Sequence, residues 1–107
     1  MTTTVTIDVG RQFSRFPVGR YLGDGESNGQ KFREDVLTPA LTRYEKVVVD
    51  LDSALGYGSS FLEEAFGGLV RAGRNKDEIL RRIELVSTDD SLKMEILQYI
   101  DDAARDK

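Results

Sequence analysis

The sequence contains no cysteine and no histidine. Without cysteine there is no disulfide framework, no thiol nucleophile and no thiolate metal site. Without histidine, Ser-His-Asp catalysis, the usual zinc sites and imidazole acid–base chemistry are excluded. These absences lead us to expect a protein that is not an enzyme and that uses no cofactor.

Long apolar runs and an excess of basic charge are also missing. No run approaches the ~18–20 apolar residues that a membrane span needs, and residues 1–10 lack the basic start and apolar core of a signal peptide. We therefore expect a cytoplasmic protein with no membrane partner. The formal net charge of −4 argues against a nucleic-acid partner bound through its phosphates. The length of 107 residues predicts a single domain, residues 1–107.

The stretch 46–70 organises the predicted fold. The valine run 47–49 is typical of a strand buried on both faces. A loop containing two glycines follows, and Ser60 with Glu63 has the spacing of a capping box at a helix start. Apolar residues then recur at helical intervals from residue 61 onward. The pattern predicts a strand, a glycine loop and a serine-capped helix, whose free N–H groups and positive dipole end lie beside two hydroxyls.

The chain before this stretch predicts one strand and one helix. Alternating apolar residues over 2–9 favour a strand with one buried face, and residues 18–22 could form a short second strand. Ser27 and Gln30 have capping-box spacing, which predicts a helix from near Asn28. Pro39 removes a backbone donor from that helix and predicts a break just before it.

The chain after this stretch predicts a helix, a strand and a final helix. The boundaries are a helix end at Gly73, a helix start at Asn75 or Lys76, a strand over 83–86 and a last helix from Asp89 or Asp90. Alternating strands and helices predict an α/β fold, a small mixed sheet with helices packed mainly on one face.

The loop at residues 56–60 is the first candidate site. It follows a strand and opens a helix, as a dinucleotide-binding fingerprint does, but Phe61 stands where the third glycine would be and a Walker-type lysine is absent. A purely structural role explains the same residues: the glycines form the turn and a serine caps the helix. A third interpretation makes Ser59 or Ser60 a phosphorylation or docking site, because a phosphate at a helix start favours the helix and adds about −2 charge.

Charged residues raise further alternatives. Asp50 and Asp52 share a strand face and could hold Mg²⁺ or act as an acid/base pair, although a solvated strand end is the simpler account. Residues 24–35 superficially match a calcium loop but lack its entering helix, so we expect no metal site. Four arginines could gather around an anion, or could instead pair with acidic residues: Arg11, Arg15, Arg20 and Arg33.

Several segments together resemble a known family, the STAS-like domain family of unknown function. These segments are Phe13-Ser14, Pro17, Gly19-Arg20, Ser27, Gly29, Phe32-Arg33, VVVDLD and GYGSSFLEEAFGGLVR, over about residues 5–72, and GSSFLEEAFG is the most specific. The wider superfamily includes the bacterial anti-sigma factor antagonists, in which a partner kinase of the histidine-kinase-type ATPase class phosphorylates a serine at a strand-to-helix junction.

The antagonist motif at that junction is Asp-Ser-Ser/Thr-Gly-Leu. This chain reads Gly58-Ser59-Ser60-Phe61-Leu62, so the two serines match by position while the acid and the glycine do not. The resemblance implies that Ser59 occupies the phosphoacceptor position, with Ser60 beside it. It also implies a role in signalling by partner switching.

We therefore expect a regulatory module that docks a protein partner, such as a histidine-kinase-type ATPase, through the surface of residues 56–66. The residues predicted to contact a partner or ligand are Arg20, Arg33, Asp52, Gly56, Tyr57, Gly58, Ser59, Ser60 and Glu63. One alternative is a small-ligand or nucleotide sensor that binds a phosphate group at residues 56–60. Another is an acidic inhibitor from a mobile element. The sequence leaves the oligomeric state open.

Overall fold

A computed structural model describes residues 3–106 of the chain. In this part of the chain three strands form one sheet in the order β1 (Thr4–Asp8), β2 (Lys46–Asp50) and β3 (Ile83–Val86). Both strand pairs are parallel, with Val5 opposite Val47 and Val49 opposite Leu85. The carboxyl ends of the strands therefore meet at one edge of the sheet.

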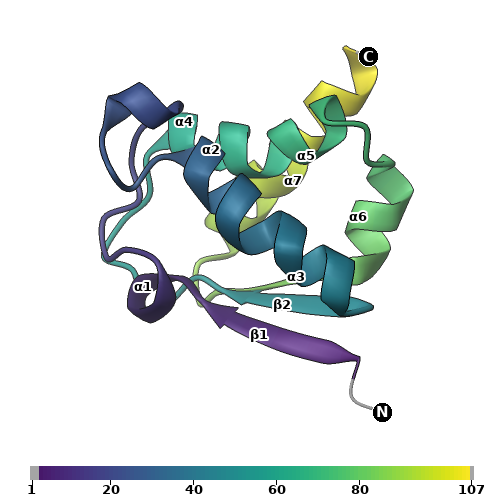
Figure 1. The fold of residues 1–107 in the computed structure, drawn as a ribbon, viewed down its shortest axis with the longest axis horizontal. Coiled ribbons are helices and arrows are strands. Elements are labelled where there is room, and N and C mark those ends of the chain that lie inside the picture. The colour runs from purple at the N-terminus through teal and green to yellow at the C-terminus, as the bar shows by residue number, and fades with distance from the viewer. Residues whose placement is uncertain (1–2, 107) are drawn as a thin grey trace.

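Two long helical segments connect the strands. The first consists of α2 (Gly29–Phe32), a π-helical turn (Arg33–Leu37) and α3 (Thr38–Arg43). The second consists of α4 (Ser59–Leu62), a second π-helical turn (Glu63–Gly67) and α5 (Gly68–Arg71), followed by α6 (Lys76–Arg82). Since both crossovers step in the same direction, right-handed connections place them on the same face of the sheet, where α7 (Asp90–Arg105) joins them (Figure 1).

Two short elements precede the first crossover. A single helical turn, α1 (Val9–Gln12), follows β1, and a 3₁₀ turn (Leu22–Asp24) lies in the loop before α2. The remainder of that loop is irregular, and it passes close to the start of α4 (Figure 1).

The core lies between the sheet and this helical layer. Val47 and Val49 are fully buried, and an aromatic cluster packs above them, with the ring centroids of Phe32 and Phe61 5.5 Å apart. Val48 is only half-buried because it points to the other face of the sheet, where Thr6 is exposed. The prediction of a strand buried on both faces is therefore wrong, because the helices cover one face alone.

The predicted α/β fold with helices mainly on one face is confirmed, but the sheet is parallel rather than mixed. The extra strand expected at residues 18–22 does not form. The carbonyls of Gly19 and Arg20 accept the N–H groups of Gly29 and Gln30, and the φ of Gly19 is 93°. These bonds commit the segment to the first turn of α2 rather than to a sheet edge.

The helical break expected at Pro39 is absent as well. The Thr38 N–H donates to the carbonyl of Arg33, five residues back, and the helix continues to Arg43. The wider π-helical turn accommodates the missing donor of proline without ending the helix.

The remaining predicted boundaries are confirmed. Gly73 ends the second helical segment with a φ of 109°, a conformation that glycine adopts without steric cost. Asn75 caps α6 and Asp89 caps α7, each accepting backbone N–H groups, and β3 covers the expected residues. Across residues 3–106, none of the helices combines the length and apolarity that crossing a bilayer requires.

Candidate functional site

Ser59 and Ser60 are exposed in the first turn of α4, at the carboxyl-end side of the sheet. The helix begins as predicted beside the glycine loop, but the predicted capping box is wrong. Gly58 occupies the N-cap position, with φ −73° and ψ 140°. The Glu63 carboxylate cannot reach back to the cap because it is engaged by Arg20 and Arg71.

An open polar pocket of about 550 Å³ lies next to the two serines. Arg20 and Tyr21 line it from the loop before α2, and Gly58, Ser59 and Ser60 line it from the start of α4. Residues about 40 positions apart are brought together here because the two loops are joined by hydrogen bonds. Gly58 N–H donates to the Pro17 carbonyl at 2.9 Å.

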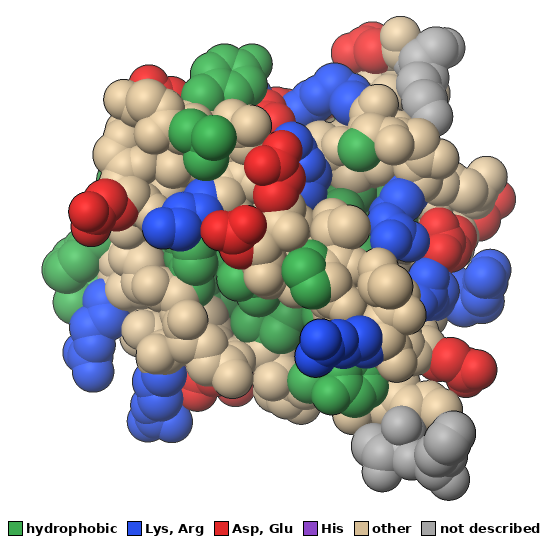
Figure 2. Space-filling model, viewed as in Figure 1, with side chains coloured by type: hydrophobic (Ala, Val, Ile, Leu, Met, Phe, Trp, Pro, Cys, Tyr) green, Lys and Arg blue, Asp and Glu red, His purple; other side chains and the backbone are tan. Residues whose placement is uncertain are grey.

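Exposed apolar side chains lie on the two loops that form this pocket. Leu55 is 67% exposed, and its N–H donates to the Arg15 carbonyl, which ties the loop after β2 to the first loop. The first loop adds four exposed apolar side chains, Phe16, Val18, Tyr21 and Leu22. Apolar side chains at the surface are visible at the upper left of Figure 2, over this loop. We call these five side chains with Ser59 and Ser60 the serine surface.

Sequence reasoning missed the apolar part of this surface, although the signal was present. The segment RQFSRFPVGRYL interleaves aromatic and aliphatic residues with arginines, and Pro17 and Gly19 prevent it from folding into an element that would bury them. Conversely, most of the second half of the predicted docking segment is inaccessible. Phe61, Leu62, Glu64, Ala65 and Phe66 are all buried.

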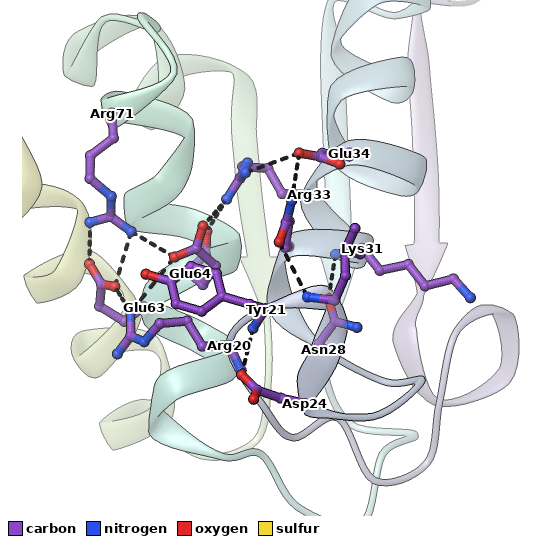
Figure 3. A network of polar contacts seen from close by, with 12 residues as sticks. Arg20, Tyr21, Asp24, Asn28, Lys31, Arg33, Glu34, Glu63, Glu64 and Arg71 are labelled. Carbon is purple, nitrogen blue, oxygen red and sulfur yellow. Dashed lines mark hydrogen bonds and ion pairs between the residues drawn. The ribbon is translucent and has the colours of Figure 1, made fainter.

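Two of the four arginines predicted to gather around an anion, Arg20 and Arg33, are held by glutamates of the second helical segment (Figure 3). Arg20 pairs with Glu63, and Arg33 pairs with Glu64. Arg71 bridges both carboxylates, at 2.5 Å from Glu63 and 3.2 Å from Glu64. The side chains of Arg33 and Glu64 are only 13% and 8% exposed, so Arg33 is part of the helix–helix interface rather than of a ligand site.

This network sets the ionisation of Glu63. Partial burial would raise the pKa of Glu63, but hydrogen bonds from Arg71 and Arg20 outweigh burial and hold the pKa below its ordinary value. The hydrogen bond that Arg71 donates to Glu63 in turn raises the pKa of Arg71. Arg20 therefore faces the serine pocket with its charge already matched by a carboxylate.

The four arginines do not gather at one place. Arg11, just after β1, pairs with Asp8. The backbone carbonyl of Arg15 accepts the N–H of Leu55 on the loop after β2. The interpretation in which scattered arginines pair with acidic residues accounts for Arg11, Arg20 and Arg33.

Asp52 and Tyr57 hold the loops at the carboxyl edge of the sheet. Asp52 lies beyond the end of β2, and its carboxylate accepts the backbone N–H of Thr88 at 2.9 Å and its hydroxyl at 3.2 Å. The Tyr57 hydroxyl donates to the Leu51 carbonyl at 2.8 Å. Burial, with the negative charges of Asp50 and Asp52, raises the pKa of Tyr57 well above its ordinary value. Both side chains have structural partners.

Neither of the two metal alternatives that the sequence raised finds support in the described residues. The Asp50 carboxylate accepts the Asp52 N–H at 3.0 Å, which makes the pair a local turn. In the segment that superficially matches a calcium loop, residues 29–35 are helical and cannot wrap an ion. Within residues 3–106, no three acidic side chains are arranged as metal ligands.

Tyr99 on α7 lies against the start of α4. Its hydroxyl donates to Glu95 at 2.6 Å, and this hydrogen bond, with burial, raises the pKa of Tyr99 to about 12, while a contact with the Ser59 hydroxyl lowers it in part. The sequence offered no signal for this contact, because the two residues are 40 positions apart.

One family model matches the chain. It is described as a STAS-like domain of unknown function (DUF4325), and it covers residues 28–93, from the start of α2 into α7. The match includes Ser59 and Ser60 but not the loop that carries Phe16, Val18, Tyr21 and Leu22. The chain matches no curated protein and no solved structure.

Proposed function

This chain belongs to the STAS-like domain family of unknown function, and from that premise we propose that it is a non-enzymatic regulatory module that docks a protein partner through the serine surface. The observation that carries the proposal is the pair of exposed hydroxyls at a helix start, next to two hydrogen-bonded loops that expose five apolar side chains. Contiguous exposed apolar side chains with a polar rim are typical of protein interaction sites.

Two parts of this surface differ in how they relate to the family. The serines lie within the family match, whereas four of the five apolar side chains lie before residue 28. We propose that the helix start provides the regulated contact and that the first loop determines which partner binds. Buried aromatic anchors contribute a large share of the affinity at many interfaces, and the first loop offers Phe16 and Tyr21 for this role.

Phosphorylation of a serine would switch this contact. Both hydroxyls are exposed, so a kinase can reach them. A phosphate would add about −2 charge to a surface that loses its water when the partner binds, in a chain whose net charge is already −4. The added charge would weaken the contact. The resemblance to the anti-sigma factor antagonists would put Ser59 at their phosphoacceptor position, and a phosphate there would also lie near the Tyr99–Glu95 pair. We propose a histidine-kinase-type ATPase as the modifying partner.

Affinity capture followed by direct binding tests the proposal. A protein captured by the wild-type chain is purified, and its affinity is measured for the wild type, for Ser59→Glu/Ser60→Glu and for Leu55→Glu. We expect both variants to bind at least tenfold more weakly. Thr4→Glu/Thr6→Glu, which adds the same charge at exposed positions on the uncovered face of the sheet, is the matched control and should bind normally. Unchanged affinity in both serine-surface variants would reject the proposal.

Intact-mass analysis tests the switch separately. The chain is incubated with ATP and the captured partner, and we expect one added phosphate that Ser59→Ala or Ser60→Ala removes. A partner that binds but adds no phosphate would retain the docking surface and overturn the switch.

The open pocket favours a second candidate, a sensor for a small phosphate-bearing ligand. Arg20, Ser59 and Ser60 line a space of about 550 Å³, and a ligand there would have to displace Glu63 from Arg20. Thermal unfolding with a nucleotide panel separates the candidates. A ligand at a hundred times its Kd should add about 2.7 kcal/mol of stability, and the absence of any shift rules out the sensor.

A further inference from the structure

Ser59 and Ser60 are neighbours in the first turn of α4, but they have different surroundings. On a helix, a residue lies next to the residues three and four positions further along, which for Ser60 are Glu63 and Glu64. The Arg20 guanidinium contacts both carboxylates, because it pairs with Glu63 and lies 3.7 Å from Glu64. Arg20 and Ser60 also line the same open pocket. Ser60 is therefore on the side of the turn that Arg20 covers.

Ser59 is on the side of the turn that faces α7. Its hydroxyl contacts the hydroxyl of Tyr99, whose single proton is already donated to the Glu95 carboxylate at 2.6 Å. A phosphate on Ser59 would face this carboxylate across a hydroxyl that has no second proton to donate. Like charges at such a short range repel each other. The two exposed serines thus differ in the charge beside them, positive for Ser60 and negative for Ser59.

Arg20 can leave Glu63 because a second arginine holds the same carboxylate. Arg71 donates two hydrogen bonds to Glu63, at 2.5 and 3.0 Å, and Figure 3 shows Glu63 between the two guanidiniums. Glu64 is held in the same way without Arg20, by Arg33 and Arg71. Departure of Arg20 would therefore leave neither carboxylate without a positive partner, and the cost of burying an unpaired charge does not arise.

The backbone of Arg20 is fixed while its side chain is free to change partner. Asp24 is the one acidic side chain among the described residues that line the pocket. Its carboxylate accepts the backbone N–H groups of Arg20 at 3.2 Å and of Tyr21 at 2.8 Å. The Arg20 carbonyl accepts the N–H of Gln30 at 3.0 Å. These bonds hold the loop in place, so a change of partner requires rotation of the Arg20 side chain alone.

We infer that Ser60, rather than Ser59, is the serine whose phosphate switches the serine surface, and that Arg20 leaves Glu63 to bind this phosphate. The inference rests on the proposed function, because it concerns the same switch. In the modification, the Ser60 Oγ forms a bond to the γ-phosphorus of ATP, and the bond from that phosphorus to the departing oxygen of ADP breaks. A base of the kinase accepts the hydroxyl proton.

The charge and geometry of a phosphate favour the exchange of partners. Arg20 contacts Glu63 through one nitrogen, Nη1, whereas a guanidinium commonly binds a phosphate through two parallel hydrogen bonds. A phosphate also carries about −2 charge, against −1 for a carboxylate. With Glu63 already held by Arg71, the guanidinium of Arg20 gains more from the phosphate than it loses from Glu63.

The exchange would reach the apolar part of the serine surface. Arg20 lies in the first loop between Val18 and Tyr21, which are 51% and 55% exposed. A phosphate on Ser60 that binds Arg20 links this loop directly to the start of α4. A modification on one segment can therefore alter how another segment presents its apolar side chains to a partner.

Two forms of the full chain, with phosphoserine inserted during translation at position 60 or at position 59, test the inference. The two proteins have the same mass and charge, so each is the matched control of the other. Titration followed by ³¹P NMR measures the second pKa of each phosphate, which is ordinarily about 6. We expect this pKa to lie below about 6 at position 60, beside a guanidinium, and at or above about 6 at position 59, beside a carboxylate.

An arginine variant provides the second readout. In the form with phosphoserine at position 60, Arg20→Gln should return the phosphate pKa toward its ordinary value. Arg11→Gln, at an exposed ion pair with Asp8, is the control and should leave the pKa unchanged. The NMR signals of the Arg20 guanidinium should shift as the phosphate at position 60 ionises and should stay in place as the phosphate at position 59 does.

Three results would overturn the inference: equal pKa values at the two positions, a lower value at position 59, or a value at position 60 that Arg20→Gln leaves unchanged. The comparison of the two phosphoserines needs no arginine variant, so it decides the question even if Arg20→Gln does not fold. A kinase that phosphorylates Ser60→Ala but not Ser59→Ala also overturns it. The titrations use neither kinase nor docking partner, so their outcome is separate from whether the serine surface binds a protein.

Discussion

Arg33 and Glu64 are 31 positions apart in the chain, and their side chains meet where the two long helical segments cross. The guanidinium of Arg33 also donates to the Glu64 backbone carbonyl at 3.0 Å. Both residues adjoin or lie within a π-helical turn, a distortion that is frequent at functional sites. This pair positions the helix whose first turn carries Ser59 and Ser60, so it links the stability of the fold to the geometry of the serine surface.

Replacing Arg33 should destabilise the protein strongly. Arg33→Met leaves the Glu64 carboxylate largely buried with weaker compensation from Arg71, and we expect a loss of about 3 kcal/mol. Arg33→Met/Glu64→Leu should recover most of this loss, because apolar side chains of similar volume often replace a buried pair without cost. Urea unfolding measures both variants. Arg11→Met, at an exposed ion pair, is the control, and an equal loss there would show that the buried pair has no special role.

Gly29 should not tolerate alanine. A Cβ at Gly29 would approach the carbonyl oxygen of Phe61 to 2.5 Å and the Cβ of Glu64 to 3.0 Å, so α2 and α4 would have to separate. We expect Gly29→Ala to cost about 1–3 kcal/mol. Gly23→Ala meets no atom within 4 Å and should change stability by no more than about 0.5 kcal/mol. Similar unfolding midpoints for the two variants would contradict the close helix crossing.

The cap of α2 should depend on Asn28 rather than on Ser27. The Asn28 side chain accepts the Lys31 N–H at 2.8 Å and donates to the Gly25 carbonyl at 2.7 Å, and the residue is buried. Asn28→Ala should cost about 1–2 kcal/mol. Ser27→Ala removes only a contact with the Ser14 hydroxyl and should cost less. Thermal unfolding of the two variants compares them, and the reverse order would restore the capping box expected from the sequence.

Glu63 should make stability depend on pH in the acid range. Its pKa in the folded protein lies below the ordinary value of 4.5, so the ionised carboxylate stabilises the fold above that pH. This contribution is lost as the pH falls through the folded-state pKa. Glu63→Gln removes it, and the free energies of unfolding of the two proteins should converge on acidification. If the free energies of unfolding of the wild type and of Glu63→Gln differ by the same amount from neutral pH to pH 3, the arginine contacts do not stabilise the charged form of Glu63.

Sequence patterns predicted the local elements well where a single physical signal dominated. The helix starts at Asn75 or Lys76 and at Asp89 or Asp90, the helix end at Gly73 and the strand at residues 83–86 all depend on short-range chemistry, and all are confirmed. Two of the failures share a cause. The strand expected at residues 18–22 and the capping role of Ser60 were lost because long-range partners, the start of α2 and the arginines around Glu63, bind the same groups.

The candidate site divides in the same way. That Ser59 and Ser60 lie at an exposed helix start followed from the order of strand, glycine loop and helix in the sequence. That Arg33 is buried against Glu64, that Arg20 is already paired, and that the loops carrying Phe16, Val18 and Leu55 are joined beside the serines were decided by the tertiary structure. Backbone propensity, capping and periodicity act between neighbours in the chain, so the sequence contains them directly. The partners of a charged or apolar side chain depend on which segments the packing of the two crossovers brings together, and only the folded chain determines that.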